Sequence, residues 1–512
     1  MSPHGPRNKW LIAFTVMLPT LIEIIDTSIV NVSLDHIRGS LSAGIEEATW
    51  AINAYLVANA IVIPMSGWLS RLFGRKNYQV GSIIVFTVSS FLCGSAWSLP
   101  SLIFFRVLQG MAGGGLVPVS QSILLEAFPP KQHGMAMAIF GVGAMVGPIL
   151  GPIMGGWITD NWSWRWIFYI NIPLGAFAVL MNLLVIQDPP WMQRTRMRID
   201  YLGLVFLALG LGALQLVLDR GQQEDWFNSE LIIGFALVSA FALAFLVVNE
   251  LTDAQPIVNL RLFKDRTFAT GCLVMFCLFF NLFGSIVLLP IYVQSLMGYS
   301  AYDAGMVLGP GGAMTLLTMP VVGKLVQKVN PKRILAVGIL ICSYTTWTMA
   351  HFNLQADFWT FVWPRVTLGL GMGFSFIPLT TLTLSHIPRE KLGQATSMYN
   401  LLRNMGGSVG IAFVTTYLAR RTQFHHARLA EHMTPFDPAY ALAKAKAGAA
   451  LAAQGLSPAG ADGLIYGQLV RQARALAFND TFTITAVMLL FVLILVALMQ
   501  RAEAPPRPDA AH

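Results

Sequence analysis

Fourteen apolar runs, each long enough to cross a lipid bilayer, constrain this chain more than any other feature. A hydrocarbon core of roughly 30 Å needs about 20 apolar residues in a helix that rises 1.5 Å per residue. The runs occupy residues 10–34, 49–70, 78–97, 101–125, 135–159, 165–187, 200–218, 231–250, 268–293, 304–323, 333–351, 358–384, 394–419 and 478–500. Charged residues make up 11% of the chain, well below the roughly 25% of a soluble domain. The sequence therefore predicts an all-α, polytopic membrane protein with fourteen transmembrane helices.

Lysine and arginine gather in alternate loops, which sets the orientation of these helices. One set of loops holds most of them: Arg71, Arg75, Lys76, Lys131, Arg194, Arg196, Arg198, Arg261, Lys264, Arg266, Lys324, Lys328, Lys332, Arg333, Arg389 and Lys391. The short loops of the other set hold Arg38 and Arg220, with Arg165 at a membrane edge. Because positively charged loops stay in the cytoplasm, both termini are predicted to be cytoplasmic. The net charge of +8 is a property of these loops and predicts no binding of nucleic acid.

One outer segment, residues 420–477, breaks the pattern of short loops. It is polar, basic and rich in alanine. Long loops are translocated regardless of their charge, so this segment does not change the predicted orientation. Its stretch 439–453 favours helix, because alanine has the highest helix propensity. We expect a periplasmic loop that extends from the membrane.

The two halves of the chain repeat each other. Four residues recur after a constant interval of 259 residues: Arg106, Gly110, Pro129 and Gly134 correspond to Arg365, Gly369, Pro388 and Gly393. The turns that follow Gly67 and Gly323 correspond as well. Two six-helix bundles in parallel repeat, at 1–199 and 251–512, therefore flank two inserted helices at 200–250. A duplicated bundle with a site between its halves is typical of secondary transporters.

Two acidic residues lie inside the first apolar run, where charge is costly. Glu23 and Asp26 are three residues apart and share one face of a helix. A carboxylate at mid-bilayer costs about 3 kcal/mol. Either these acids pair with a basic residue of another helix and hold the bundle together, or they bind protons or a cationic ligand. Intramembrane acids are functional by default, which favours the second interpretation.

Arg106, in the fourth run, is the expected partner of Asp26. At the helical rise, Arg106 lies about 8 Å and Asp26 about 12 Å from the outer ends of their runs. An ion pair at this depth lowers the cost of burying both charges. Glu23 lies a turn deeper without an evident partner, which makes it the easier group to protonate. We predict that Glu23, Asp26 and Arg106 form a proton-coupling site.

Arg365 and Arg403 are buried basic residues of the second half, whose apolar runs hold no acid to match them. Proton chemistry is therefore expected in the first half. We place the substrate pathway at polar residues within the apolar runs: Asn31, Gln109, Asn281, Arg365 and Arg403. Acids in this pathway favour cationic substrates, and the many methionine and phenylalanine residues suit a pliable apolar pocket.

Glycines form a strip along the fifth predicted helix. They recur every fourth residue, with one more beside the last: Gly143, Gly147, Gly151, Gly155 and Gly156. Such a strip allows a neighbouring helix to approach closely. Pro148 and Pro152 add kinks that membrane helices tolerate. The strip is either ordinary tight packing or a hinge along which helices slide, and the two prolines favour the hinge.

Several of these stretches match motifs of a known family. They are Asp26-Thr-Ser-Ile-Val-Asn31-Val, Gly67-Trp-Leu-Ser-Arg71-Leu-Phe-Gly74-Arg75-Lys76, Arg106-Val-Leu-Gln109-Gly110 and Gly147-Pro148-Ile-Leu-Gly151-Pro152-Ile-Met-Gly155-Gly156. Two more are typical of one subfamily: Trp164-Arg165-Trp166-Ile-Phe-Tyr-Ile-Asn171-Ile-Pro173, and Leu218-Asp219-Arg220-Gly221 leading to Asp225-Trp226-Phe227. Over essentially its whole length the chain resembles the major facilitator superfamily, specifically fourteen-helix drug:proton antiporters of the Emr type (EmrB-like subunits).

The resemblance implies a proton-coupled multidrug efflux antiporter of the bacterial inner membrane that exports hydrophobic, amphipathic or cationic toxic compounds. It implies no cofactor besides the proton gradient and no metal. The implied partners are a periplasmic membrane-fusion adaptor, an outer-membrane channel and membrane lipid. Within the superfamily the glycine-proline motif favours exchange over symport, and the motif at Gly67, Arg71, Gly74 and Arg75 forms a cytoplasmic gate loop.

Two departures from the family pattern limit what the resemblance implies. The general loop motif has an aspartate where this chain has Arg71, so its usual charge relay cannot be carried over. Glu23 is not part of the family's first-helix signature, so its proposed role rests on its burial alone.

Other functions are weighed against this one. The chain has no G-x-x-x-x-G-K-[ST] motif, which disfavours an ATP-driven pump. No H-E-x-x-H motif occurs either. Export of one endogenous metabolite, a polytopic membrane enzyme and a scaffold are the alternatives that stay open.

Overall fold

The computed structural model describes residues 8–188, 200–253, 255–431, 433–434, 436–454 and 457–499. Within these ranges it leaves aside the side chains of Val32, Ile45, Glu46, Pro148, Ile149, Pro152, Ala301 and Pro458. The described residues are almost entirely helical and contain no strand.

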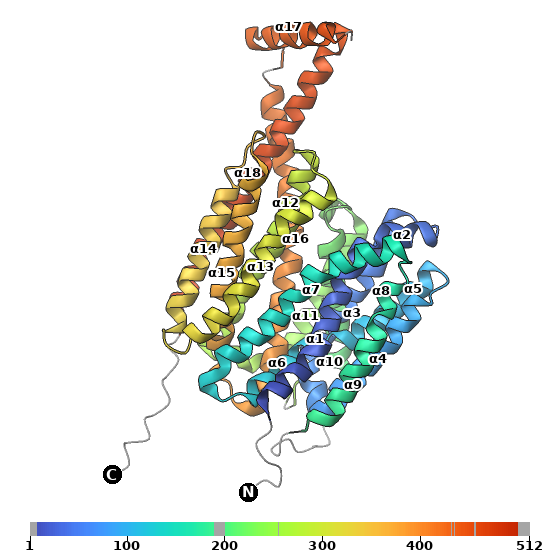
Figure 1. Cartoon of the computed structure of the whole chain (residues 1–512), viewed down its shortest axis with the longest axis vertical. Coiled ribbons are helices and arrows are strands. Elements are labelled where there is room, and N and C mark those ends of the chain that lie inside the picture. Colours follow the sequence, from blue (N-terminus) through green and yellow to red (C-terminus); the bar gives the residue numbers. More distant parts are fainter. Residues whose placement is uncertain are drawn as a thin grey trace.

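Residues 8–188 form one series of helices, which Figure 1 colours from blue to green. In order they are α1 (Lys9–Val32), α2 (Leu34–Ser40), α3 (Ile45–Phe73), α4 (Arg75–Gly94), α5 (Leu99–Gly113), α6 (Leu116–Ala127), α7 (His133–Asn161), α8 (Trp166–Tyr169) and α9 (Asn171–Val185). Two helices follow, α10 (Tyr201–Arg220) and α11 (Glu230–Thr252). The remaining helices are α12 (Arg266–Ser295), α13 (Ala301–Leu325), α14 (Pro331–Met349), α15 (Phe358–Leu384), α16 (Leu392–Ala430), α17 (Pro438–Ala453) and α18 (Ala461–Leu498).

Each apolar run of the sequence is mainly helical, and two of them are divided, 101–125 between α5 and α6 and 165–187 between α8 and α9. Among the described residues, 10 helices are long and apolar enough to cross a membrane, and the fold is that of a multi-pass membrane protein. Side chains cap several helices where apolar sequence begins. Asp265 accepts a hydrogen bond from the backbone N–H of Phe268 at the start of α12, and Asp357 accepts one from Thr360 at the start of α15. These caps satisfy N–H groups that the first helical turn leaves without partners.

Gly74 makes the sharp turn between α3 and α4. Its φ of 83° lies in the left-handed region, which side-chain-bearing residues rarely adopt. A Cβ atom there would lie 2.6 Å from an oxygen of Asp188, which also accepts a hydrogen bond from the backbone N–H of Lys76 at 2.9 Å. Beside the turn, Arg75 forms an ion pair with Glu126 at the end of α6. The predicted gate loop is therefore tied to α6 and to the end of α9.

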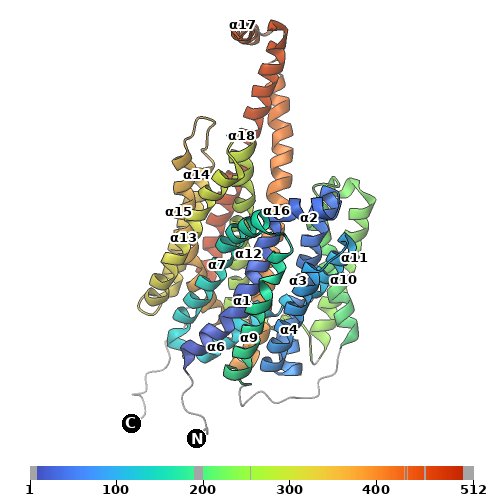
Figure 2. The same cartoon turned by 45° about the vertical axis from the view of Figure 1, so that its right-hand side comes forward.

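Helices from the beginning and the end of the chain meet in two places. α3 packs against α16, and α7 packs against α13. Of the inserted pair, α10 lies beside α3 and α16, and α11 packs against α10 (Figure 2). Trp226 in the α10–α11 loop donates a hydrogen bond to Thr416 of α16 at 3.0 Å, and Arg220 lies 4.8 Å from the ring centroid of Trp50. The stretch Asp219–Phe227 thus fastens the inserted pair to both sides.

The arm formed by residues 420–477 differs from the predicted loop. α16 continues without a break to Ala430, and α18 begins at Ala461, well before the apolar run that starts at 478. Figures 1 and 2 show these two helices extending together past the rest of the molecule, with α17 across their far end. Asp480 of α18 accepts hydrogen bonds from Arg421 at 2.6 Å and His425 at 2.7 Å on α16. Both helices thus continue beyond the apolar runs 394–419 and 478–500, because hydropathy marks the segments that suit lipid and not the ends of a helix.

Candidate functional site

Asp26 and Arg106 form the predicted ion pair in the interior of the helix bundle. Arg106 Nη1 of α5 lies 2.6 Å from Asp26 Oδ2 of α1. The side chains are 1% and 0% exposed, so both charges are withdrawn from solvent. Removing one partner of such a pair strands the other charge, which costs roughly 3–5 kcal/mol.

Neutral groups complete the environment of this pair. Gln109 and Asn171 each donate an amide hydrogen to Asp26 Oδ1 at 2.9 Å. Arg106 donates from Nη1 to Gln109 Oε1 at 2.8 Å and from Nε to the carbonyl of Ala51 at 2.9 Å. Because both charges are fully paired, this cluster holds α1, α3, α5 and α9 in one arrangement.

Glu23 has partners that the sequence analysis missed, so the prediction that it lacks one is wrong. Its Oε1 accepts hydrogen bonds from the Tyr55 hydroxyl at 3.3 Å and from Asn59 Nδ2 at 3.2 Å. Arg403 of α16 attracts the Glu23 carboxylate across the interface between early and late helices. These bonds are longer than those of Asp26 and come from neutral donors, so Glu23 is held less tightly.

Tyr55 and Asn59 could have been found by their spacing. They lie four residues apart in the run 49–70 and therefore share one face of α3. Tyr55 also covers the Arg106 guanidinium, which lies 4.2 Å from the centroid of its ring. A single residue thus contacts two of the three members of the predicted proton-coupling site, Glu23 and Arg106. What the spacing could not reveal is that this face turns toward α1.

The structure joins some of the predicted pathway residues and separates others. Gln109 belongs to the Asp26 cluster. The guanidinium of Arg403 lies 5.6 Å from the ring centroid of Phe279 and interacts electrostatically with Glu23. Asn31 is exposed and donates to the carbonyl of Thr27 on its own helix at 3.2 Å, apart from both acids. Asn281 is buried and accepts a hydrogen bond from Thr346 at 3.2 Å. Arg365 donates to the Ser285 hydroxyl at 3.0 Å.

The glycine strip of α7 faces α1. A Cβ atom added at Gly151 would lie 2.5 Å from Ser28 Cβ, and one at Gly155 would lie 2.7 Å from Ile29 Cγ1. A Cβ at Gly147 would collide with Ile24, and one at Gly143 with Met17. Gly156 is half-buried beside the strip. The side chains of Pro148 and Pro152 lie outside the described residues, and the helix continues through both positions. Close approach is thus observed, and its partner is the helix that carries Glu23 and Asp26.

Two glycine contacts join early and late helices at the end of the molecule that holds the gate loop. A Cβ at Gly67 would lie 2.7 Å from the carbonyl oxygen of Gly393, and one at Gly134 would lie 3.2 Å from that of Gly323. Ser66 and Ser397 are hydrogen-bonded at 2.8 Å beside the first contact. Arg71, half-buried, lies on the same helix as Gly67. Early and late helices therefore touch each other at this end of the molecule.

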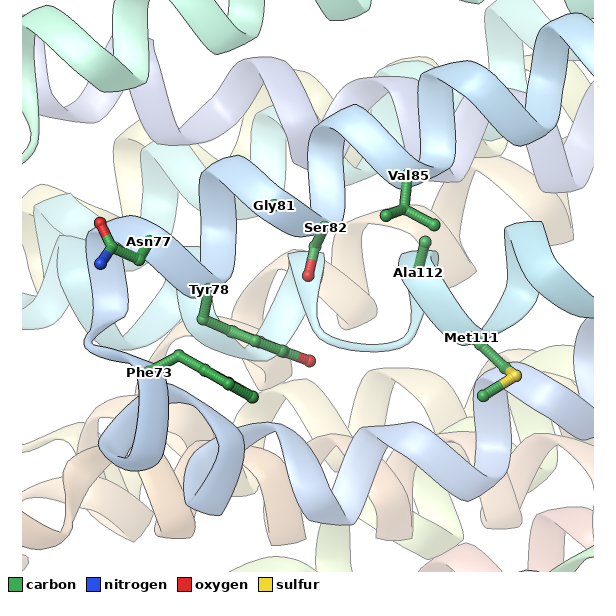
Figure 3. A pocket seen from close by; sticks show the side chains of 8 residues that line it. All are labelled: Phe73, Asn77, Tyr78, Gly81, Ser82, Val85, Met111 and Ala112. Atoms are coloured by element: carbon green, nitrogen blue, oxygen red, sulfur yellow. The ribbon is translucent and has the colours of Figure 1, made fainter. Parts of the chain in front are cut away.

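A groove between the end of α3, α4 and α5 lies apart from the two acids. Figure 3 shows Phe73, Tyr78, Val85 and Met111 among its lining side chains. Its lining contains none of the predicted site residues. We assign no substrate to this groove.

Ser408 lies in a stretch, Gly406 to Gly410, whose letters match the serine-hydrolase motif G-x-S-x-G. In hydrolases that serine lies on a sharp turn between a strand and a helix. Here the stretch lies inside α16, and Ser408 accepts a hydrogen bond from Gln215 at 3.1 Å. The structural context of a nucleophile is missing at this serine.

The family is decided by a comparison with known families. Residues 16–411 match the model of the Major Facilitator Superfamily. The chain belongs to this superfamily. It is therefore a multi-pass transporter and not an enzyme.

Similar proteins agree with this assignment. The chain is 39% identical over 490 residues to the multidrug export protein EmrB of Escherichia coli strain K12, covering 95% of this chain and 94% of that protein. It is 34% identical over 501 residues to the fatty acid resistance protein FarB of Neisseria gonorrhoeae, covering 98% and 97%. Among solved structures, the proton:xylose symporter XylE has a TM-score of 0.61 at 13% identity, covering 96% of this chain and 99% of that chain. The last comparison supports the major facilitator fold alone.

Proposed function

We propose that this protein is a proton-coupled multidrug efflux antiporter of the bacterial inner membrane. It would export hydrophobic or amphipathic toxic compounds, including cations. One observation carries the proposal: of the two buried acids on α1, Asp26 is bonded tightly and Glu23 is bonded weakly. Asp26 is fixed by a cation and two amides, whereas Glu23 accepts two longer, neutral hydrogen bonds. The similarity to proteins named for multidrug export supports the substrate class.

In this mechanism Glu23 exchanges a proton for a drug. The charged carboxylate attracts Arg403 on α16, so protonation weakens the attraction between α1 and α16. A cationic drug restores a partner to the carboxylate once the proton has left. Asp26 and Arg106 hold the surrounding helices together during this exchange and respond to whether Glu23 carries a proton or a drug. Proton and drug can be exchanged in this way because each of them shifts the equilibrium between the same two arrangements of the helices.

The proposed topology has fourteen transmembrane helices in two six-helix repeats, with α10 and α11 between them and both termini cytoplasmic. Two pairs of contacts support the repeat. Arg106–Asp26 and Arg365–Ser285 both join residues 80 positions apart in the chain. The Gly67–Gly393 contact has its counterpart in Gly323–Gly134, with the roles of the helices exchanged.

Proteoliposomes provide the test of this function. A cationic dye such as ethidium, added to vesicles with no imposed gradient, should drive proton movement in the opposite direction, visible with a pH-sensitive dye. Movement of the dye without proton movement would mark a uniporter and refute the antiport mechanism. Product formed from a lipid without dye movement would mark an enzyme.

We expect leucine at Gly147 or Gly151 to abolish transport. Its side chain collides with Ile24 or Ser28 of α1, so α1 and α7 can no longer slide past each other. Uptake of ethidium into inverted vesicles should fall at least tenfold, while the amount of inserted protein stays similar. The control is Gly234→Leu on α11, where an added Cβ meets nothing within 4 Å. Full activity with leucine at both α7 positions would contradict the hinge.

We further propose that the arm docks a periplasmic adaptor that connects the pump to an outer-membrane channel. The helices of the arm are fastened together rather than loose, which suits a docking element. Asp462 of α18 pairs with Lys444 of α17 at 2.8 Å and accepts a hydrogen bond from Tyr440 at 2.6 Å. At the tip, Phe436 is 94% exposed, an apolar side chain with no cover among the described residues.

Trimming residues 430–470 is expected to separate two activities. Vesicle transport should be retained, because the trimmed segment lies outside the helix bundle (Figures 1 and 2). Drug resistance of cells should be lost, because the exported drug would remain in the periplasm. The measurements are ethidium transport in vesicles and the minimal inhibitory concentration in a strain lacking other pumps. Resistance unchanged by the trim would count against the three-part assembly.

A further inference from the structure

Arg365 in the later helices corresponds in position to Arg106 in the earlier helices. α5 begins at Leu99 and α15 at Phe358, so each arginine lies seven residues after the start of its helix. Each donates from Nη1 to a residue 80 positions earlier, Asp26 in one case and Ser285 in the other. The two sites differ in one respect: a carboxylate in the first is a hydroxyl in the second.

This difference leaves Arg365 without a counter-ion. The residue is 6% exposed and Ser285 is 3% exposed. Arg365 forms no ion pair with any acid in the described part of the chain. Its Nε, unlike that of Arg106, has no hydrogen-bond partner among the described residues. A guanidinium keeps its charge at any physiological pH, so this site holds an uncompensated positive charge.

Asn281 adds a second unused donor to the same helix face. It lies one turn before Ser285 on α12 and is 2% exposed. Its Oδ1 is occupied by Thr346, whereas its Nδ2 has no partner among the described residues. Buried donors without partners are costly and uncommon in folded proteins. A buried guanidinium with one free donor, bonded to a serine one helical turn from a second free donor on Asn281, has the chemistry of an anion site.

We propose that Arg365, assisted by Asn281, binds the carboxylate of an amphipathic anionic substrate. The carboxylate would occupy the place that Asp26 occupies beside Arg106, and charge-assisted hydrogen bonds from the guanidinium would hold it. The inference rests on the proposed efflux function and extends it. Glu23 receives cations and Arg365 receives anions, which gives one pump substrates of both charges.

The test is equilibrium binding of radiolabelled decanoate to the purified full-length protein in lipid nanodiscs at pH 8. Decanol, with the same chain and no charge, is the reference ligand. Ser285→Asp recreates the arrangement of the first site and places a carboxylate of the protein itself beside Arg365. We expect the affinity for decanoate to fall at least tenfold and the affinity for decanol to change less than threefold. Ser285→Asn, similar in size and uncharged, should bind decanoate within threefold of the parent.

Two further measurements, binding by Arg365→Gln and the Tm of Ser285→Asp, distinguish loss of the anion site from misfolding. Arg365→Gln must also weaken decanoate and spare decanol, and it adds no new group to the site. Ser285→Asp should raise the Tm of the protein, because it supplies the missing counter-ion, so weaker binding would not reflect misfolding. Unchanged decanoate affinity in Arg365→Gln, or an equal loss in Ser285→Asp and Ser285→Asn, would overturn the proposal. So would displacement of decanoate by chloride in place of gluconate, which would assign the site to an inorganic anion.

The binding assay contains no proton gradient and no cationic drug. Loss of proton coupling would therefore appear in the proteoliposome test and leave decanoate binding unchanged. If the anion site is wrong, the decanoate binding test would fail and proton movement in the proteoliposome test would be unaffected.

Discussion

Replacing Glu23 by glutamine is expected to uncouple the pump. Glutamine keeps the size of the side chain and can still accept the hydrogen bonds of Tyr55 and Asn59, but it cannot bind or release a proton. Drug movement down its own gradient should persist, and accumulation driven by a proton gradient should fall at least tenfold. Drug-induced proton release from detergent-purified protein, measured from pH 6 to 9, checks this directly.

Glu250→Gln is the matched control for this experiment. Glu250 is another buried acid, on α11, where it accepts a hydrogen bond from the backbone N–H of Val258 at 3.1 Å. It lies outside the proposed site, so drug-induced proton release should match the parent. If Glu23→Gln releases as many protons as the parent and Asp26→Asn releases none, the roles of the two acids are reversed.

Asp26→Asn is expected to impair folding and transport together. Asparagine removes the charge that balances Arg106, in a site where both side chains are withdrawn from solvent. Stranding this guanidinium should cost about 3–5 kcal/mol of stability. Both downhill drug movement and proton release should fall, and the Tm of the purified protein should drop.

The double variant Asp26→Asn/Arg106→Gln distinguishes the loss of the ion pair from the stranding of one unpaired charge. Because it removes both charges, it should recover part of the Tm that Asp26→Asn loses. Transport should stay impaired, since Gln109 and Asn171 would still lack the carboxylate to which they donate. A double variant less stable than Asp26→Asn would show that the two charges do not act as a pair.

The cluster around Asp26 and Arg106 shows what could be predicted from local sequence. The Asp26–Arg106 pair was predictable because two opposite charges at the same depth in lipid leave few ways to lower their cost. The glycine strip was predictable for the same kind of reason, since small residues every fourth position form one helix face. Helix existence followed from the length of the apolar runs, and those predictions needed no knowledge of neighbours.

The partners of Glu23 could not be predicted from local sequence. Tyr55, Asn59 and Arg403 are readable as polar residues in apolar runs, but nothing local states which helix each one faces. The same holds for the strip of α7, whose partner α1 precedes it by more than a hundred residues. In lipid the hydrophobic effect does not favour one lateral neighbour over another, so helix order depends on packing and hydrogen bonds between distant residues.

The sequence by itself thus determined the class of protein, the positions of the long apolar helices, and the residues whose burial demands a partner. Each of these depends on the free energy of transferring a short segment from water to lipid, which is a local quantity. Tertiary structure alone decided that Glu23 is bonded by Tyr55 and Asn59, that Arg365 lacks a counter-ion among the described residues, and that α16 and α18 continue into the arm. These depend on how helices distant in the chain approach each other, because a buried charge is satisfied or stranded by its neighbours in space and not by those in sequence.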